Sequence, residues 1–481
     1  MWQVSYMRKD DKKKYLILKD RNIYKGLIIL AIPLMLNNLL KSLHDIVDMI
    51  FVGRIPDVGT QSVAAIQLTF PIMFTFLSLG MGMSVAGTAL ISQFLGMGHR
   101  REARRYASQL LVLAGLLGVI LNIVSYTAAP MIIRSMGVDP LASAADAYIF
   151  ESSTQYLRIR AFELPFLFLF FSLLAVRQAG GDTTTPVLVS GTAIITNIFL
   201  SYIFIRVLNL GVPGAAYATL VANVLIMPAG LYLLFFAKSG ITVSVADMRL
   251  QKGVVKDIVR TAVPASMGQA ITAIGFYLMN GIIYSYGPET VAAFGVGNRI
   301  MSMILHPVMA MGGVLSAYIG QNIGAHNPDR ARLTFRKAML LSSGTMAVGA
   351  GIIMIFRGFL AVLFIVDDPI ALALAVEYMF YILLGLPLMA VFQTFMGTYN
   401  GTGFTQFSFI LSVSRLWGMR IPLVIAFREW TALGSSGIWY AMLISNFVAA
   451  FLGWMLYKRL TFEPKVRIEE PITKHVELKT T

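Results

Sequence analysis

The chain has 481 residues, of which 57% are hydrophobic and only 13% are charged, and its formal net charge is +15. Soluble domains carry roughly 25% charged residues. A soluble protein of this size cannot bury so much apolar surface, so the composition indicates an integral membrane protein. The chain contains no cysteine, which excludes disulfides, thiolate metal sites and thiol nucleophiles.

The predicted elements are membrane-spanning helices, because long segments almost free of charge recur along the whole chain. A hydrocarbon core of ~30 Å needs ~20 apolar residues per helix. Turn residues such as Gly180–Gly181–Asp182, and a break at Gly401–Thr402–Gly403, separate these segments. The twelve predicted spans are 26–52, 58–99, 106–133, 152–176, 183–205, 207–237, 261–288, 300–328, 338–356, 378–400, 405–427 and 430–457. The alternation typical of membrane strands is absent, so we expect an all-α integral membrane protein.

The basic residues indicate how these helices are oriented. Most of the 39 Lys and Arg residues lie in the two tails and in the loops that follow even-numbered spans. Basic residues favour the cytoplasmic side of short loops, so we expect both termini to be cytoplasmic. The positive net charge is then a topology signal, together with contact between the basic N-terminal tail and anionic membrane lipids. No nucleic-acid partner is expected.

The chain repeats itself in two halves. Pro33 pairs with Pro264, Gln93-x-x-Gly96 with Gln321-x-x-Gly324, Gly181 with Gly403 and Gly214 with Gly437, at offsets between 222 and 231. Because the period contains six spans, the halves share one orientation and form two six-helix lobes with the substrate cleft between them. The expected divisions are a cytoplasmic basic tail (1–25), an N-lobe (26–238), a cytoplasmic linker with a surface helix (239–256), a C-lobe (257–458) and a cytoplasmic tail (459–481).

Charged residues inside the spans are candidates for function, because an ionisable group in hydrocarbon costs ~2.5–3.5 kcal/mol. Lys41, Asp45 and Asp48 lie at i, i+4 and i+7 and therefore share one face of the first span. Lys41 and Asp45 are one turn apart, so they are interpreted either as a structural ion pair or as functional residues. Asp48 is left without an evident partner, which makes it a candidate to carry a proton or a small cation. Glu163 and Arg160 are expected to form a local ion pair.

The second half is unlike the first in charge. Arg299, Arg415 and Arg420 lie within its spans, where they could bind backbone carbonyls or reach an interface. The spacing from Pro33 to Asp48, counted from Pro264, leads to Met279 rather than to a carboxylate. The repeat therefore predicts that the two lobes have similar helix arrangements but different polar groups inside them.

Other kinds of chemistry lack a sequence signal. The chain has no Walker A motif, no dinucleotide-binding fingerprint and no HExxH pattern. We therefore expect no catalytic residues, no metal site and no cofactor apart from a coupling ion. The five histidines are expected to be structural, and they are His44, His99, His306, His326 and His475. A membrane-embedded enzyme or a receptor is a remote alternative, because the chain shows neither a paired nucleophile and base nor an extramembrane domain.

Several segments taken together resemble a known transporter family. They are 31–53 (AIPLMLNNLLKSLHDIVDMIFVG), 90–104 (LISQFLGMGHRREAR), 164–186 (LPFLFLFFSLLAVRQAGGDTTTP), 197–219 (NIFLSYIFIRVLNLGVPGAAYAT) and 319–332 (IGQNIGAHNPDRAR). They are similar to the multidrug and toxic compound extrusion (MATE) family, from about residue 25 to residue 458. The resemblance implies a twelve-helix, two-lobed antiporter that expels organic cations and other amphipathic compounds in exchange for H⁺ or Na⁺.

The resemblance also implies site residues. Asp48 matches the family's first-helix carboxylate, which serves cation coupling, and Asn197 and Thr219 match an asparagine and a threonine of archaeal and related bacterial members. Those members usually carry a second carboxylate four residues after the asparagine, where this chain has Ser201. Lys41 and Asp45 stand where uncharged polar residues are usual, so we assign them as possible modulators.

We therefore expect a secondary active transporter of a bacterial cytoplasmic membrane. It exports amphipathic or cationic small molecules by alternating access, as a monomer. Coupling to H⁺ is favoured over Na⁺, because the uncharged hydroxyl of Ser201 compensates a buried sodium ion poorly. The alternative is a related exporter or flippase for one dedicated metabolite or lipid-linked substrate.

Overall fold

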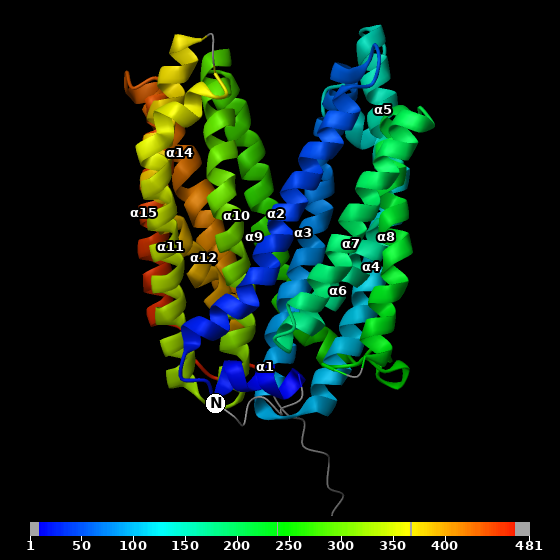
Figure 1. Cartoon of the computed structure of the whole chain (residues 1–481), viewed down its shortest axis with the longest axis vertical. Coiled ribbons are helices and arrows are strands. Elements are labelled where there is room, and N and C mark those ends of the chain that lie inside the picture. Colours follow the sequence, from blue (N-terminus) through cyan, green and yellow to red (C-terminus); the bar gives the residue numbers. More distant parts are fainter. Residues whose placement is uncertain (1–8, 238, 366–367, 467–481) are drawn as a thin grey trace, which may run out of the picture.

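The computed structural model describes residues 9–237, 239–365 and 368–466, and these residues form helices joined by turns, without a β-strand (Figure 1). In chain order the helices are α1 (Lys9–Leu18), α2 (Ile23–Gly53), α3 (Gly59–Met97), α4 (Arg100–Ser135), α5 (Ala144–Ala161), α6 (Leu164–Ala179), α7 (Thr184–Ser201), α8 (Gly211–Phe236), α9 (Lys252–Tyr284), α10 (Pro288–Gly324), α11 (Pro328–Val362), α12 (Pro369–Gly401), α13 (Thr405–Val413), α14 (Ile421–Trp430) and α15 (Ser436–Lys458). Two π-helical segments, η2 (Tyr202–Val207) and η4 (Ser414–Arg420), extend α7 and join α13 to α14.

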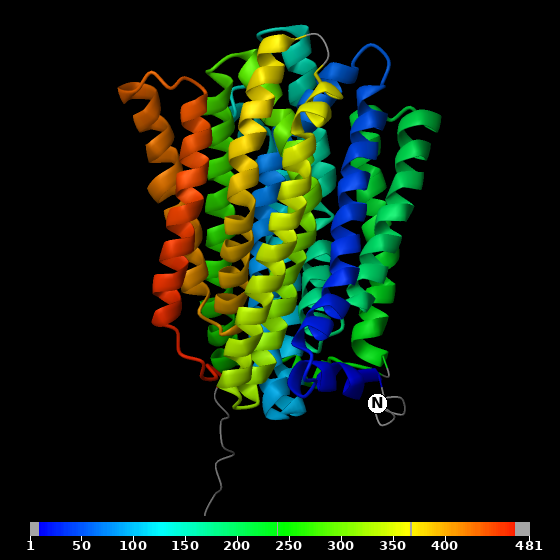
Figure 2. The same ribbon diagram turned by 60° about the vertical axis from the view of Figure 1, so that its left-hand side comes forward.

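The described helices account for eleven of the twelve predicted spans by length and composition. Ten helices or continuous helix runs in the described chain are long and apolar enough to cross a membrane. The helices α5 and α6 meet at a bend of 49° and together supply one broken span. The helix α10 has 37 residues, runs alongside the others (Figure 2) and lies at the position of the predicted span 300–328. The predicted all-α membrane fold is confirmed.

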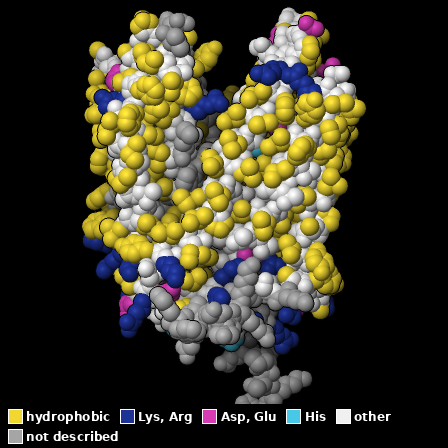
Figure 3. Space-filling model, in the orientation of Figure 1, with side chains coloured by type: hydrophobic (Ala, Val, Ile, Leu, Met, Phe, Trp, Pro, Cys, Tyr) yellow, Lys and Arg dark blue, Asp and Glu magenta, His cyan; other side chains and the backbone are white. Residues whose placement is uncertain are grey.

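The spans form two bundles that approach each other at one end of the molecule and diverge at the other (Figure 1). We call these the closed end, where α1 lies, and the open end. One apolar core lies mainly within α3–α8, around Leu110 and Phe168, and extends to the first turns of α9. A second lies within α9–α15, around Tyr378 and Trp439. The helix α2 starts against α10 of the second bundle and continues against α7 of the first. A space-filling view shows the hollow between the bundles at the open end (Figure 3).

Two connecting regions differ from the sequence predictions. The basic tail contains the helix α1, which was not predicted. The predicted surface helix of the linker is wrong, because α9 already begins at Lys252 and only a short 3-10 turn, Val245–Asp247, precedes it. The rest of the linker runs along α4, where the backbone N–H of Ser244 donates to Ser108 Oγ at 3.0 Å. Backbone N–H groups of the linker therefore bind side chains of α4, and these linker residues do not form a separate helix.

At the closed end, the repeated Gln-x-x-Gly motifs hold the two bundles together reciprocally. Gln93 on α3 donates from Nε2 to the backbone carbonyl of Gly401 at 3.2 Å, at the end of α12. Its repeat partner Gln321 on α10 donates from Nε2 to the carbonyl of Ala179 at 2.6 Å, at the end of α6. Ala179 and Gly401 are 222 residues apart, which is the repeat offset. Each lobe therefore caps a helix end of the other through an equivalent bond.

The first described residues cross from one bundle to the other over the closed end. Lys13 of α1 forms an ion pair with Asp182 of the first bundle, with 2.7 Å between Nζ and Oδ1. The carbonyl of Leu16 accepts from Tyr318 Oη of α10 at 2.7 Å. Arg330 of α11 donates from Nε to the carbonyl of Ile17 at 3.0 Å. The helix α1 is thus bound to both lobes.

The ion pair between Lys13 and Asp182 predicts a pH-dependent stability. Burial alone would raise the pKa of Asp182, but hydrogen bonds from Lys13 and Thr185 outweigh it and hold that pKa below its ordinary value. A carboxyl with a lowered folded-state pKa stabilises the fold above its unfolded pKa, near 3.9, and this contribution disappears as pH falls through the folded pKa. We expect Asp182→Asn to lower the Tm by roughly 2–5 °C at pH 7.

The measurement is thermal unfolding of the purified protein between pH 7 and pH 3, where the difference from wild type should shrink below about pH 4. Asp329→Asn is the matched control, because Asp329 also forms an ion pair, with Arg332 at 3.1 Å, but its carboxylate is 91% exposed, and exposed pairs contribute little. A Tm difference for Asp182→Asn that stays constant across this pH range would contradict the assignment.

Candidate functional site

The four site residues inferred from the family resemblance lie together inside the first bundle. Ser201 donates from Oγ to Asp48 Oδ1 at 3.0 Å and lies 3.2 Å from Asn197 Oδ1. Asn197 donates from Nδ2 to Thr219 Oγ1 at 2.9 Å. Asn197, Ser201 and Thr219 are all buried. Helices α2, α7 and α8 therefore bring one carboxylate, one amide and two hydroxyls into a continuous network, which we call the Asp48 network.

The two α7 residues of this network lie directly before a local irregularity of the fifth span. Ser201 is the last residue of α7 and directly precedes the π-helical segment η2. A π-helical turn shifts the side chains that follow it relative to a regular helix, and such turns are frequent at functional sites. Asn197 and Ser201 are one helical turn apart before this shift, so both face α2.

The sequence analysis missed His44 as a member of the network. Its Nε2 lies 2.8 Å from Asn197 Oδ1 and 3.3 Å from Asp48 Oδ2. Its Nδ1 lies 3.3 Å from Asp45 Oδ1. The imidazole therefore stands between the two carboxylates of α2. Its spacing of four residues from Asp48 was the one available signal, because residues four apart share a helix face.

The structure also corrects the pairing predicted along α2. The predicted Lys41–Asp45 ion pair is wrong, since Asp45 contacts His44 and the described residues include no ion pair of Lys41. Asp48 does have partners, namely Ser201 and His44. The physical reason is the position of Asp45, because its side chain is 66% exposed and lines the cavity between the bundles, where water solvates its charge without a lysine partner.

The predicted local ion pair of Glu163 is confirmed. Arg160 Nε lies 2.7 Å from Glu163 Oε2, and Glu163 is buried. Asn223 connects this pair to the Asp48 network, since its Nδ2 donates to Glu163 Oε1 at 2.8 Å and to the backbone carbonyl of Thr219 at 3.0 Å. The buried charge of Glu163 is thus compensated, whereas the network around Asp48 contains no arginine or lysine contact in the described chain.

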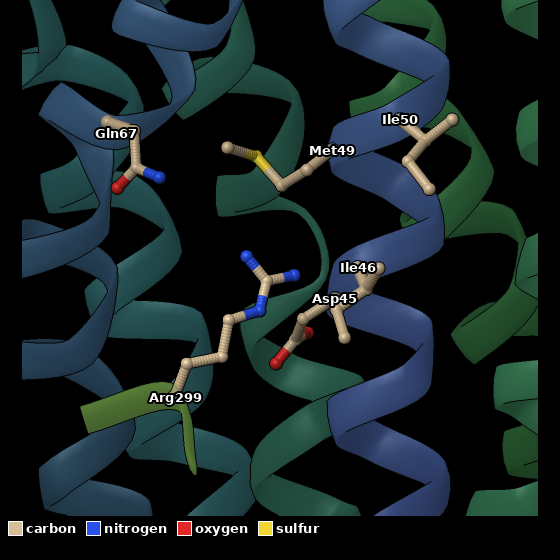
Figure 4. A pocket seen from close by; sticks show the side chains of 6 residues that line it. All are labelled: Asp45, Ile46, Met49, Ile50, Gln67 and Arg299. Carbon is tan, nitrogen blue, oxygen red and sulfur yellow. The ribbon is translucent and has the colours of Figure 1, made fainter. Parts of the chain in front are cut away.

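A cavity of about 450 Å³ lies between the two bundles toward the open end. It is lined by Asp45, Ile46, Met49, Ile50, Gln67 and Arg299. Figure 4 shows the guanidinium of Arg299, from α10, directed across the cavity toward Asp45 and Met49 of α2. Asp45 therefore connects the cavity to His44 and to the Asp48 network. A volume of this size is within the range that drug-sized ligands occupy.

The remaining histidines do not form a second site in the described residues. His99 directly precedes α4, and His326 occupies a left-handed turn between α10 and α11. The side chains of His306 and His475 lie outside the part of the chain that the structure describes. The described residues contain no group of three or more His, Cys, Asp or Glu side chains that could hold a metal ion.

Comparisons with known proteins agree on one family. The MatE family model matches residues 33–203 and 264–425, one segment in each lobe. The chain is 25% identical over 425 residues to the probable multidrug resistance protein YoeA of Bacillus subtilis, covering 87% of this chain and 90% of that protein. It is also 25% identical over 473 residues to an FAD transporter of Shewanella oneidensis, covering 92% and 97%.

The fold agrees as well. The crystal structure of MATE in complex with MaD3S is similar to this structure with a TM-score of 0.85 at 25% identity. The likeness covers 93% of this chain and 98% of that one.

Proposed function

The chain belongs to the multidrug and toxic compound extrusion (MATE) family, and we propose that it is a proton-coupled antiporter that exports amphipathic drugs and organic cations. Members of this family are transporters, not enzymes. One observation carries the proposal: the Asp48 network reaches the cavity between the lobes through His44 and Asp45. A proton that enters from the cavity can therefore reach Asp48 by way of an imidazole.

The position of His44 favours H⁺ over Na⁺ as the coupling ion. Sodium would need several oxygen ligands at once, and the network offers those of Asp48, Asn197, Ser201 and Thr219. His44 Nε2 already contacts two of these residues, at Asn197 Oδ1 and Asp48 Oδ2. Imidazole is the side chain whose ordinary titration falls between pH 5 and 8. A carboxylate beside an imidazole needs only a proton to change its charge.

The cleft supports transport by alternating access. The bundles contact each other at the closed end and diverge at the open end (Figure 1). With both termini on the cytoplasmic side, as the basic residues predict, the open end faces outward. Flexible thioethers such as Met49 suit a cavity that accepts varied apolar compounds. The same proposal includes a monomer in a bacterial cytoplasmic membrane, in contact with its lipids and with no cofactor besides the coupling ion.

The function is tested in vesicles that contain the purified protein and are loaded with ethidium, a cationic dye. An outside pH below the inside pH should accelerate dye loss several-fold over equal pH, because protons enter as dye leaves. A sodium gradient at fixed pH should have little effect. Strong sodium-driven efflux without a pH difference would overturn the proton assignment.

A gain of sodium coupling is expected for Ser201→Asp. The substitution adds a second carboxylate within reach of Asp48, and a second negative charge offsets much of the cost of dehydrating sodium. The same vesicles should then show dye efflux under a sodium gradient at fixed pH. Ser201→Ala is the matched control, because it removes the hydroxyl without adding charge and should show none. Equal sodium drive in the two variants would contradict this account of the site.

A second candidate is an exporter dedicated to one metabolite. The FAD transporter of Shewanella oneidensis supports it, because that protein aligns with 92% of this chain. A panel of cationic dyes and antibiotics separates the two candidates. Protection of cells against several unrelated compounds supports the multidrug exporter, and protection against none supports the dedicated one.

A further inference from the structure

The three arginines that the sequence places within predicted spans of the C-lobe have no carboxylate partner in the described chain. They are Arg299 of α10 and the pair Arg415 and Arg420 of η4. Within the described residues none of them forms an ion pair, although eight such pairs are present elsewhere. A membrane-embedded charge normally pairs with another charge or faces a polar cavity. The C-lobe therefore holds uncompensated positive charge.

Arg420 occupies the C-lobe position that corresponds to Asn197. The offset of 223 that pairs Gly214 with Gly437 also pairs Asn197 with Arg420. Arg420 is 4% exposed, and its guanidinium donates from Nε to Ser445 Oγ at 3.0 Å and from Nη2 to Asn446 Oδ1 at 2.9 Å. Both acceptors are neutral. The C-lobe thus holds a fixed cation where the N-lobe holds an amide beside a carboxylate.

Arg415, one π-helical turn earlier, is also 4% exposed. Its Nη1 lies 3.0 Å from the thioether sulfur of Met389, and its guanidinium carbon lies 4.3 Å from the ring centre of Phe392. Its buried Nε has no hydrogen-bond partner. A thioether is a weak acceptor, and an aromatic face compensates a buried cation only in part. One N–H of this side chain is therefore free to bind an acceptor.

A polar route leads from the cavity between the lobes toward η4, the segment that carries the two arginines. Arg299 lines that cavity, and Asn298 is its neighbour on α10. Tyr378 donates from Oη to Asn298 Oδ1 at 2.8 Å, and it packs in the same buried core as Leu416 of η4. The route contains amide, phenol and guanidinium groups, which all bind anions by donating hydrogen bonds.

We propose that Arg415 and Arg420 form an anion subsite in the C-lobe that takes a carboxylate or phosphate group. Guanidinium groups bind these oxyanions by charge-assisted and often bidentate hydrogen bonds. The inference rests on the proposed function in one respect, since it takes the cavity between the lobes as the substrate site. The anion has two sources, the acidic group of an amphipathic substrate or a free inorganic anion, and the experiment separates them.

The test compares two aromatic probes that differ in charge, 2-naphthoate and its neutral amide 2-naphthamide. Their binding to the purified protein is measured by titration calorimetry without any ion gradient. We expect wild type to bind the acid at least about tenfold more tightly than the amide, which corresponds to about 1.4 kcal/mol. Arg420→Gln and Arg415→Gln should each remove most of this preference, and Arg420→Lys should keep part of it because it keeps the charge.

Arg357→Gln is the matched control. Arg357 is also a C-lobe arginine with an unpartnered Nε and a ring contact, to Phe380 at 5.5 Å, but it belongs to α11 and lies outside the subsite. It should keep the full preference for the acid. Competition with chloride and inorganic phosphate identifies the source. Displacement of naphthoate at comparable concentration shows a free-anion site, and weak displacement shows a site for the acidic group of a substrate.

Equal affinity of wild type for the two probes, including binding of neither, would overturn the proposal, and so would full preference in both glutamine variants. Size-exclusion profiles show that each variant is folded before its binding is measured. Binding is measured without a gradient, so it does not depend on transport. A wild type that fails to export ethidium would contradict the proposed function, but the binding preference would still test the anion subsite.

Discussion

Asp48→Asn is expected to abolish proton-driven efflux while leaving the protein inserted and folded. The asparagine amide fits the space of the carboxylate and can still accept from Ser201, so the network keeps its shape. An amide does not titrate and carries no charge, so it cannot take up a proton in one conformation and release it in the other. Ethidium efflux under an imposed pH difference should fall to the rate of protein-free vesicles.

Asp45→Asn is the control for this prediction. Asp45 also contacts His44, but its carboxylate is 66% exposed at the cavity, where water can replace it as a proton acceptor. We expect this variant to retain most of the pH-driven efflux. If vesicles that contain Asp48→Asn still lose dye under the pH difference as fast as wild-type vesicles do, Asp48 is not the coupling residue.

The spans and the repeat could be predicted from the sequence because the membrane imposes them. A charge in hydrocarbon is costly and an unpaired backbone is impossible there, so charge-free lengths reveal the helices directly. Glycines also recur at equivalent positions of the two halves for a physical reason. Gly181 and Gly403 both adopt a φ of 77°, a left-handed conformation that glycine adopts without strain.

The contents of the site were harder to predict, since they depend on contacts between distant segments. Asp48 was predicted from its place inside a span, whereas Asn197 was identified through a family resemblance, and 153 positions separate His44 from Asn197. No spacing rule connects such residues, so His44, a single histidine in an apolar helix, was predicted to be structural. The prediction of a Lys41–Asp45 ion pair was wrong for another reason. Helical spacing allows a contact, but it does not show which charges face water.

Gly324→Ala is expected to shift the protein toward a conformation in which the closed end opens. A Cβ at Gly324 would overlap the backbone carbonyl of Gln93, and a Cβ at Gly96 would overlap that of Gln321. Backbone atoms cannot rotate away as a side chain can, so the lobes must separate. Overpacking of this kind costs about 2 kcal/mol, which changes an equilibrium between two conformations by roughly thirtyfold.

Ser92→Cys reports this opening, because Ser92 is fully buried against Gly320 of the opposite lobe and the native chain has no cysteine. A thiol reagent should label the cysteine faster in the Gly324→Ala background than in the wild-type background. Gly344→Ala is the matched control, since nothing lies within 4 Å of a Cβ at that position, and it should not change labelling. Labelling at the wild-type rate in Gly324→Ala would mean that the Gln-x-x-Gly contacts do not hold the closed end. Faster labelling would show that the close approach of the lobes requires glycine at position 324. Gly96 makes the equivalent contact in the repeat, so the same requirement would apply there.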